Sequence, residues 1–245
     1  MNITKQLFAF FLLTIIVTAF TSCSNENCIN GSGEQKSKTI TLSPFTRIFS
    51  YNKSNITIVQ GDEFKVEVDG DANIVDEYLS FNVVKDACYI KLESNCFNDY
   101  NLNIKLTLPT LKDVRSYGSD KIRIENFKEQ SELYLELVGS GDIILNEFKG
   151  VEELRSSITG SGSIRLNKQL KIENTSISIV GSGDYKGYNA LTKNCNVSIP
   201  GSGICEVSVS SKLKVSIPGS GRVYYKGTPE ISFSNPGSGA LINAN

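Results

Sequence analysis

Residues 135–166 read LELVGSGDIILNEFKGVEELRSSITGSGSIRL, and this stretch holds two Gly-Ser-Gly triplets that begin at Gly139 and Gly160. The triplet, or its near match Gly-Ser-Asp at residues 118–120, starts at positions 118, 139, 160, 181, 201, 219 and 237. The intervals are 21, 21, 21, 20, 18 and 18 residues. A period of this size is typical of a solenoid, in which each repeat buries its apolar face against its neighbours.

Apolar residues form columns when the repeats are aligned on the first glycine. The columns lie two and four residues before that glycine and four and six residues after it, and polar residues such as Ser178 and Ser198 separate them. A spacing of two is the periodicity of a β-strand with one buried face. We therefore predict an all-β protein, a parallel β-helix of about seven coils, with a stack roughly 30 Å long.

The Gly-Ser-Gly triplets are predicted to form the corners between strands. A sharp corner needs a positive φ or a close approach of two chain segments, and glycine allows both without steric cost. Pro200, Pro218 and Pro236 precede the last three corners, where a fixed φ suits a strand end. The predicted corner residues are Gly139, Gly141, Gly160, Gly162, Gly181, Gly183, Gly201, Gly203, Gly219, Gly221, Gly237 and Gly239.

Residues 39–109 form a different kind of β region. Apolar residues alternate over 56–59 and 64–68 on either side of a Gln-Gly-Asp turn, which predicts a hairpin, and only residues 73–79 suit a short helix. We expect first coils or a cap here, since the terminal apolar face of a solenoid must be covered. The predicted division is 39–109 as the cap and 110–245 as the β-helix, within one continuous domain of residues 39–245.

The N-terminus has the features of an export signal. Lys5 precedes an uncharged run of 14 residues, 7–20, which is shorter than the about 20 residues of a membrane-spanning helix. The sequence FTSC at residues 20–23 resembles the lipobox of bacterial lipoproteins, although Phe20 stands where Leu is usual; the alternative is an ordinary cleavage site. We predict a signal peptide over 1–22, lipidation of Cys23 and a flexible tether over 23–38 with a reach of roughly 20 Å.

Five cysteines remain if Cys23 is lipidated, so they cannot all pair within one chain. None of the spacings is CxxC, which argues against a zinc ribbon or a thioredoxin-like site. Cys88 and Cys96 flank a predicted turn and are a candidate pair, the alternative being that they stay unpaired. Cys195 and Cys205 fall in inward columns, where two small buried apolar residues are a simpler interpretation than a disulfide or a metal pair.

The composition excludes several classes of protein. The 245 residues include 25 Lys plus Arg, 26 Asp plus Glu and no His. Without His, the chain lacks the commonest general base and the usual imidazole ligand of catalytic zinc. The balanced charge offers no broad basic surface, so we expect no nucleic-acid partner.

Candidate metal and catalytic residues are few. Asp120 and Asp142 are weak metal candidates that would share a cation if they stacked on adjacent coils, the alternative being two solvated carboxylates. Glu152 and Glu153 lie beside Arg155, but a surface charge cluster is the ordinary explanation, and a polysaccharide-cleaving β-helix would gather more carboxylates. We therefore predict no catalytic residue, no cofactor and no enzyme.

Outward aromatic residues are the candidates for glycan binding. Tyr134, Tyr188 and Tyr224 fall at outward positions of the repeats, where they are either stacking platforms for sugar rings or ordinary β-surface residues. Their offsets from the corner glycine differ. The three residues are therefore not expected to form one stripe.

The order of motifs resembles one known family. FTRI at 45–48, ITI at 56–58, VEV at 66–68 and LTLPTL at 106–111, followed by Gly-Ser-Gly corners, are similar to the "putative autotransporter adhesin head GIN domain" family. The resemblance runs from residue 39 to about residue 243. It implies a β-helical fold and a secreted or lipid-anchored protein in the envelope of a Gram-negative bacterium.

Together these features predict a lipid-anchored protein of the outer membrane or cell surface that serves as a non-enzymatic adhesion or scaffold module. The alternative is a lipoprotein that binds a glycan or another small ligand. The expected partners are the membrane, through the lipid, and a surface glycan or an envelope protein. An outward aromatic or acidic patch across three or more coils would favour binding, whereas a featureless Ser/Thr face would favour a scaffold.

Overall fold

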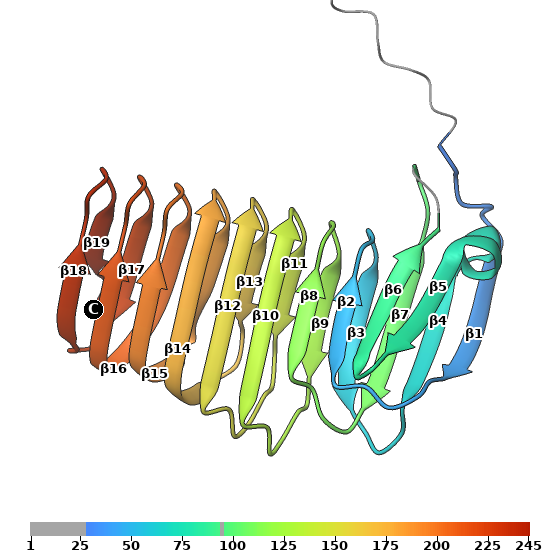
Figure 1. Cartoon of the computed structure of the whole chain (residues 1–245), viewed down its shortest axis with the longest axis horizontal. Helices are drawn as coiled ribbons and strands as arrows, with labels where there is room; N and C mark the ends of the chain where they lie inside the picture. The colour runs from blue at the N-terminus through green and yellow to red at the C-terminus, as the bar shows by residue number, and fades with distance from the viewer. Residues whose placement is uncertain (1–27, 94–95) are drawn as a thin grey trace, which may run out of the picture.

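The computed structural model describes residues 28–93 and 96–245, which form an elongated β-solenoid of about six turns (Figure 1). The predicted all-β solenoid is confirmed, and its predicted number of coils is close. The predicted signal peptide and the predicted lipidation site Cys23 lie outside the described residues. None of the helical segments within 28–93 and 96–245 is long and apolar enough to cross a membrane.

The first half of the described chain contains nine strands and one helical turn. These elements are β1 (Gln35–Thr41), β2 (Arg47–Ser50), β3 (Asn55–Gln60), β4 (Lys65–Asp71), the π-helical turn η2 (Ile74–Tyr78), β5 (Leu79–Val84), β6 (Ala87–Leu92), β7 (Leu102–Leu108), β8 (Asp113–Ser116) and β9 (Lys121–Glu125).

The second half contains only strands. They are β10 (Glu132–Gly139), β11 (Asp142–Leu145), β12 (Glu153–Gly160), β13 (Ser163–Leu166), β14 (Leu170–Gly181), β15 (Asp184–Ser198), β16 (Ile204–Ser216), β17 (Arg222–Lys226), β18 (Glu230–Ser234) and β19 (Ala240–Asn243).

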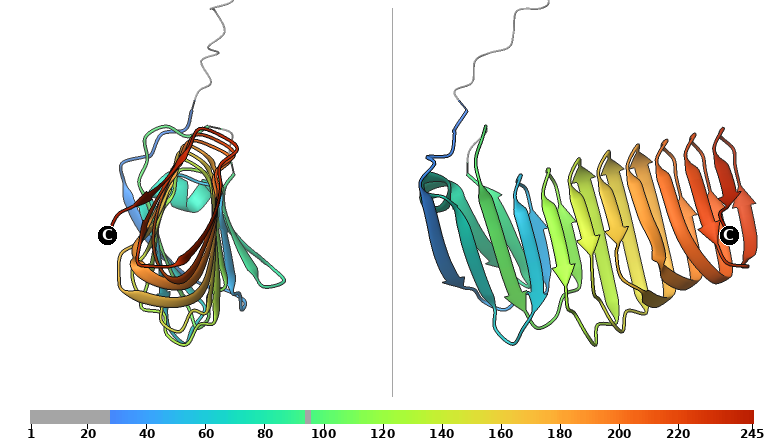
Figure 2. Two further views of the ribbon diagram at one scale, coloured as in Figure 1. Left: turned by 90° about the vertical axis from the view of Figure 1, so that its left-hand side faces the viewer. Right: turned by 180° about the vertical axis from the view of Figure 1, so that it is seen from behind.

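The coils build two faces that enclose the core (Figure 2). The strands of the first face follow the order β5, β6, β2, β8, β10, β12, β14, β15, β16 and β18. The strands of the second face follow the order β1, β4, β7, β3, β9, β11, β13, β15, β16, β17 and β19. The strands β15 and β16 are long enough to run from the second face of one coil to the first face of the next.

The predicted apolar columns point inward. Ile143 lies opposite Ile164 in register, and both side chains are fully buried. Tyr185 follows Ile164 in the same column, on β15. Its ring fits there because Gly187 has no side chain, since a Cβ at Gly187 would lie 2.5 Å from Cε1 of Tyr185. Cys195 and Cys205 are buried free thiols, which agrees with the simpler of the two interpretations.

The corners stack on one another along one edge of the solenoid (Figure 1). The backbone N–H of Ser161 donates to the carbonyl of Gly139 at 3.0 Å. Gly160 has a φ of +123°, and a Cβ there would lie 2.4 Å from the carbonyl oxygen of Gly139. Gly201 lies outside the positive-φ region, and glycine is required there only because a Cβ would lie 2.1 Å from the oxygen of Gly181. Both expected reasons for a corner glycine are therefore present: Gly160 combines them, whereas Gly201 has only the close approach.

The predicted hairpin over residues 56–68 is wrong. β3 pairs in parallel with β7 on one edge and with β9 on the other, so β4 has no free edge of β3 to bind. β4 instead pairs antiparallel with β7 and β1. The alternation defined both strands and their buried faces, but it carried no information on their partners. As a result, the coil β2–β3 lies between β6–β7 and β8–β9, although it comes first in the sequence.

The N-terminal end is closed by a cap of antiparallel strands. The cap contains the pairs β1–β4 and β5–β6, together with η2, which lies within the predicted helix of residues 73–79. A disulfide joins Cys28 to Cys96, so the candidate pair Cys88–Cys96 is wrong. Cys88 points into the core from β6 and is a buried free thiol, whereas Cys96 lies in the loop after β6.

The predicted tether over 23–38 is too long at its C-terminal end. The N–H of Ile29 donates to the carbonyl of Cys96 at 3.1 Å, and β1 begins at Gln35. The buried carboxylate of Asp71 accepts hydrogen bonds from the N–H of Gly33 at 2.9 Å and of Asn101 at 2.7 Å. Residues 28–38 are therefore part of the folded cap.

Candidate functional site

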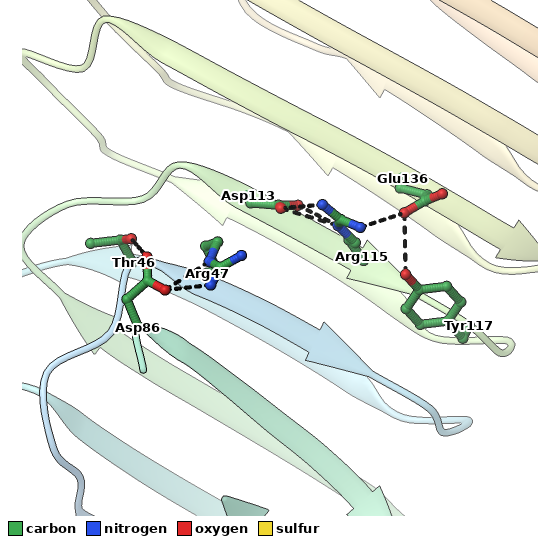
Figure 3. Close-up of polar contacts among 7 residues, drawn as sticks. All are labelled: Thr46, Arg47, Asp86, Asp113, Arg115, Tyr117 and Glu136. Atoms are coloured by element: carbon green, nitrogen blue, oxygen red, sulfur yellow. Dashed lines mark hydrogen bonds and ion pairs between the residues drawn. The ribbon is translucent and has the colours of Figure 1, made fainter. Parts of the chain in front are cut away.

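The outward surface of the first face carries a cluster of charged and aromatic side chains on its N-terminal strands. Arg115 of β8 donates to both carboxylate oxygens of Asp113 at 2.8–3.0 Å (Figure 3). Its Nη1 lies 3.4 Å from Oε2 of Glu136 on β10, and the hydroxyl of Tyr117 donates to the same oxygen at 3.2 Å. The guanidinium plane is therefore fixed between two neighbouring strands.

Aromatic rings lie on both sides of this guanidinium. The Cζ of Arg115 is 4.9 Å from the ring centroid of Phe49 and 5.0 Å from that of Tyr134. Phe49 also contacts Tyr89 edge-on at 5.2 Å. Such cation–π and edge contacts hold side chains in one arrangement. Because Tyr89, Phe49, Arg115 and Tyr134 come from β6, β2, β8 and β10, the cluster crosses four neighbouring strands.

A pair of stacked tyrosines extends the cluster toward the corners. The rings of Tyr51 and Tyr117 are 4.8 Å apart and 18° from parallel, and Nζ of Lys91 lies 5.1 Å from the Tyr51 centroid. Tyr51 is 43 % exposed, so its ring is available to a ligand. We call this surface the aromatic–arginine patch; it consists of Phe49, Tyr51, Tyr89, Arg115, Tyr117 and Tyr134.

The electrostatics of the patch keep its groups in one protonation state near neutral pH. Hydrogen bonds to Asp113 raise the pKa of Arg115 above its ordinary value. Burial raises the pKa values of Tyr51, Tyr117 and Tyr134, so their hydroxyls stay protonated. In the adjacent strand, the hydrogen bond from Arg47 lowers the pKa of Asp86 (Figure 3). The patch therefore offers uncharged tyrosine side chains, of which Tyr51 is the most exposed, while the neighbouring carboxylates are bound to guanidinium groups.

A shallow groove of about 540 Å³ continues from the patch toward the C-terminus. Tyr134 and Arg155 lie at one end, Asn196 and Lys214 at the other, and a row of serines that includes Ser178 and Ser198 forms its floor. We call this surface the serine groove. Among the described residues that line it, none is acidic.

The two metal candidates do not come together. Asp142 pairs in register with Lys121, whereas Asp120 is one residue earlier and fully buried. The Asp120 carboxylate accepts hydrogen bonds from the N–H and hydroxyl of Ser54 at 3.0 and 2.6 Å and from the Ser116 hydroxyl at 2.9 Å. Asp142 accepts a hydrogen bond from the hydroxyl of Ser163 on the next coil. Asp120 is thus a structural group that joins the displaced coil β2–β3 to β8–β9.

The other candidates fall in separate places. Glu153 forms an exposed ion pair with Arg155 on the same strand. This pair agrees with the interpretation of these residues as a surface charge cluster. Tyr134 belongs to the patch, Tyr188 packs under Nζ of Lys226 at 4.6 Å, and Tyr224 lies on the second face. In the chain described, residues 28–93 and 96–245, no group of three Cys, Asp or Glu side chains is arranged to hold a metal ion.

Of the patch residues, only Tyr134 was a candidate from the sequence, and Phe49, Tyr51 and Tyr89 were missed because they precede the recognised repeats. A signal was present: residues 48–51 read IFSY and residues 114–117 read VRSY, and the structure stacks these segments in register. Aligning them would have extended the repeat to β2 and placed Phe49 beside Arg115 on one outward surface.

Comparisons with known proteins agree with this architecture. A crystal structure of a putative adhesin from Bacteroides fragilis superimposes with a TM-score of 0.79 at 21 % identity, covering 88 % of this chain and 99 % of that one. A crystal structure described as a putative lipid binding protein from Parabacteroides distasonis gives 0.72 at 23 % identity, covering 89 % and 99 %. At these identities the likeness shows the fold alone.

Two comparisons with sequences complete the assignment. No curated protein matches the chain. The family model described as "Putative auto-transporter adhesin, head GIN domain" matches residues 44–229, which include all four strands of the patch and the serine groove. The chain therefore belongs to the head GIN domain family of putative auto-transporter adhesins.

Proposed function

We propose that the protein is a lipid-anchored, non-enzymatic adhesion module of a Gram-negative cell envelope, and that the aromatic–arginine patch is its binding surface. The observation that carries this proposal is the continuity of the patch over β6, β2, β8 and β10. Tyrosine and arginine are the residues that most often dominate binding energy at protein surfaces. Here they are preorganised on a sheet, so little conformational entropy is lost when a ligand binds.

The short connection between Cys23 and the cap supports an anchored module. Cys28 is joined to Cys96, and five residues span at most about 18 Å when extended. A lipid on Cys23 would hold the cap end of the solenoid close to the membrane. The disulfide itself supports export, because such bonds persist in oxidising compartments.

The pairing of the carboxylates beside the patch supports a binding role over catalysis. Asp113 is bound to Arg115, Asp86 to Arg47, and Glu136 to both Arg115 and Tyr117. A general acid or base must be free to exchange a proton with a substrate. Carboxylates held in this way instead fix the positions of the arginines and the tyrosine.

The anchor is tested by phase partitioning of the exported protein. Cys23→Ala should move the protein from the detergent phase to the aqueous phase. Cys28→Ala is the matched control, because it also removes a cysteine near the N-terminus but should leave the protein in the detergent phase. Unchanged partitioning of Cys23→Ala would contradict lipidation.

The binding surface is tested with beads that carry the mature protein. Retention would be measured on mucin-coated glass, on fixed epithelial cells and on fixed bacterial cells. Tyr51→Ser should lower retention at least fivefold, whereas Tyr224→Ser, a tyrosine variant on the second face, should leave it unchanged. Absence of wild-type retention on all three surfaces, or equal retention by both variants, would contradict the proposal.

A further inference from the structure

The serine groove has the chemistry of a binding site for a charged sugar polymer. We propose that it binds a segment of acidic polysaccharide containing uronic acid residues, with the chain running along the solenoid axis. This inference rests on the proposed function, because Tyr134 joins the groove to the patch. It adds the class of ligand, which the patch by itself leaves open.

The floor of the groove is a ladder of hydroxyl groups. Ser157, Ser178, Ser198 and Ser216 lie opposite one another in register on β12, β14, β15 and β16, and all are half-buried. Each hydroxyl is both a donor and an acceptor, as are the hydroxyl groups of a sugar. Neighbouring coils are ~4.8 Å apart, so successive serines repeat at about the length of one sugar ring.

One wall of the groove is polar and cationic. Tyr134, Arg155, Ser176, Asn196 and Lys214 follow one another in register on five neighbouring strands. Arg155 uses Nε and Nη2 to contact one oxygen of Glu153, at 2.8 and 2.7 Å, and its side chain is 62 % exposed. Lys214 has no ion pair with any described residue. The two cations are three coils apart, or ~14 Å, which suits a polymer with repeated carboxylates.

A less polar row of residues runs beside the serines, on the side away from Arg155 and Lys214. Val138, Thr159 and Val180 lie opposite one another in register on β10, β12 and β14, and Val180 is 45 % exposed. A pyranose ring has an apolar face of C–H groups and a polar rim. The ring would lay its C–H face against this row, where Val180 is exposed, and direct its carboxylate to Arg155 or Lys214, where arginine offers a planar fork of donors.

The position of the groove favours a glycan over an acidic peptide. Extended peptides commonly bind by adding a strand to a free sheet edge. Both edges of β12, β14 and β15 are already paired with neighbouring coils, so no backbone groups are free at the groove. Recognition must therefore use side-chain hydroxyl, amide and cationic groups, which match the groups of an acidic sugar.

Calorimetric titration of the mature protein with polygalacturonate, alginate and unsulfated chondroitin tests the inference. At least one of these polymers should bind, and the affinity should fall as salt is added. Fully methyl-esterified pectin is the control for polygalacturonate, since it keeps the backbone and loses the charge; it should bind at least tenfold more weakly.

Two charge-matched double variants locate the site. Arg155→Gln/Lys214→Gln should raise the Kd at least tenfold. Arg165→Gln/Lys186→Gln, which removes the same charge from the second face, should change it less than twofold. Circular dichroism and hydrogen exchange should show both variants folded, because all four side chains are at the surface.

Three results would overturn the inference: no binding of any of the acidic polymers, equal losses in the two double variants, or equal binding of poly-glutamate, which would indicate charge without sugar recognition. These results are distinguishable from failure of the proposed function. If beads still adhere through Tyr51 while acidic polymers do not bind, the adhesion proposal stands and the ligand class is wrong.

Discussion

The regular coils from β8 to β19 and the cap region over residues 28–108 achieve stability by different means. In the regular coils, each strand pairs in parallel with the equivalent strand of the next coil, and the same corner recurs. In the cap region, β1, β4 and β5 pair antiparallel with their neighbours, one coil is displaced from its sequence order, and a disulfide joins Cys28 to Cys96. A repeat needs only its neighbour, whereas an end needs contacts that no repeat supplies.

The patch lies where these two regions meet. β6 and β2 belong to the cap region, and β8 and β10 begin the regular coils. Farther along the first face, the equivalent outward positions hold small serines. The displaced coil is thus what places Phe49 and Tyr51 next to Arg115 and Tyr117.

Among the changes that separate the cap region from the regular coils, removal of the disulfide should have the largest effect on stability. Cys28→Ser/Cys96→Ser opens a link across 68 residues, and we expect the free energy of unfolding of the cap to fall by about 4 kcal/mol. Hydrogen exchange should accelerate over residues 28–108 and stay near wild-type rates from β12 onward. Uniform acceleration along the chain would show that the two regions unfold as one unit.

A corner substitution tests the regular coils. Gly160→Ala should destabilise the protein by about 3 kcal/mol, because it combines a positive φ with a clash against the backbone of Gly139. Ser161→Ala, at the exposed middle position, should change stability by less than about 0.5 kcal/mol. Urea unfolding of both variants measures the difference, and similar losses would contradict the stacked-corner geometry.

The buried carboxylate of Asp120 tests the joint between the displaced coil and β8–β9. Asp120→Ala leaves the donors on Ser54 and Ser116 without their acceptor and should cost about 2 kcal/mol. Asp120→Asn keeps an acceptor for Ser54 and should cost less. Urea unfolding at one pH compares the two, and equal losses would show that the hydrogen bonds contribute little.

The pH dependence of the same site has a defined sign. Burial raises the pKa of Asp120 in the folded protein, so the folded state binds its proton more tightly than the unfolded state. The stability of the wild type relative to Asp120→Asn should therefore decrease as pH rises from the unfolded-state pKa through the folded-state pKa. Urea unfolding of both proteins across this window measures the change. If the stability of the wild type relative to Asp120→Asn increased with pH instead, the burial effect would be contradicted.

The smallest expected effect concerns the coil in which Tyr185 and Gly187 stand in the apolar columns. Gly187→Ala should destabilise the protein by about 1–2 kcal/mol, since the new Cβ would meet the ring of Tyr185. Tyr185→Ile/Gly187→Ala restores the aliphatic pattern of the other coils and should recover most of the loss. Additive effects in this double-mutant cycle would show that the two positions are independent.

The sequence alone determined the repeat, the inward columns and the corners. Two local properties of the sequence define the coils: the period of the Gly-Ser-Gly triplets and the spacing of two between apolar columns. Each coil repeats them, as the pairing of Ile143 with Ile164 in register illustrates. Burial of Cys195 and Cys205 followed from their columns in the same way. Such features are predictable because each depends on a residue and its immediate neighbours.

Only the tertiary structure decided which strands pair in the cap and which cysteine pairs with Cys96. The turn after β3 indicated a hairpin, but both edges of β3 are occupied by strands from residues 102–125, and no local pattern encodes that choice. The patch depends on the same long-range choice, because Phe49 and Arg115 are 66 residues apart and meet only when β2 lies against β8. The spacing of glycines and apolar residues along the chain determined the repeat. The pairing of distant strands at the N-terminal end of the solenoid assembled the candidate binding surface.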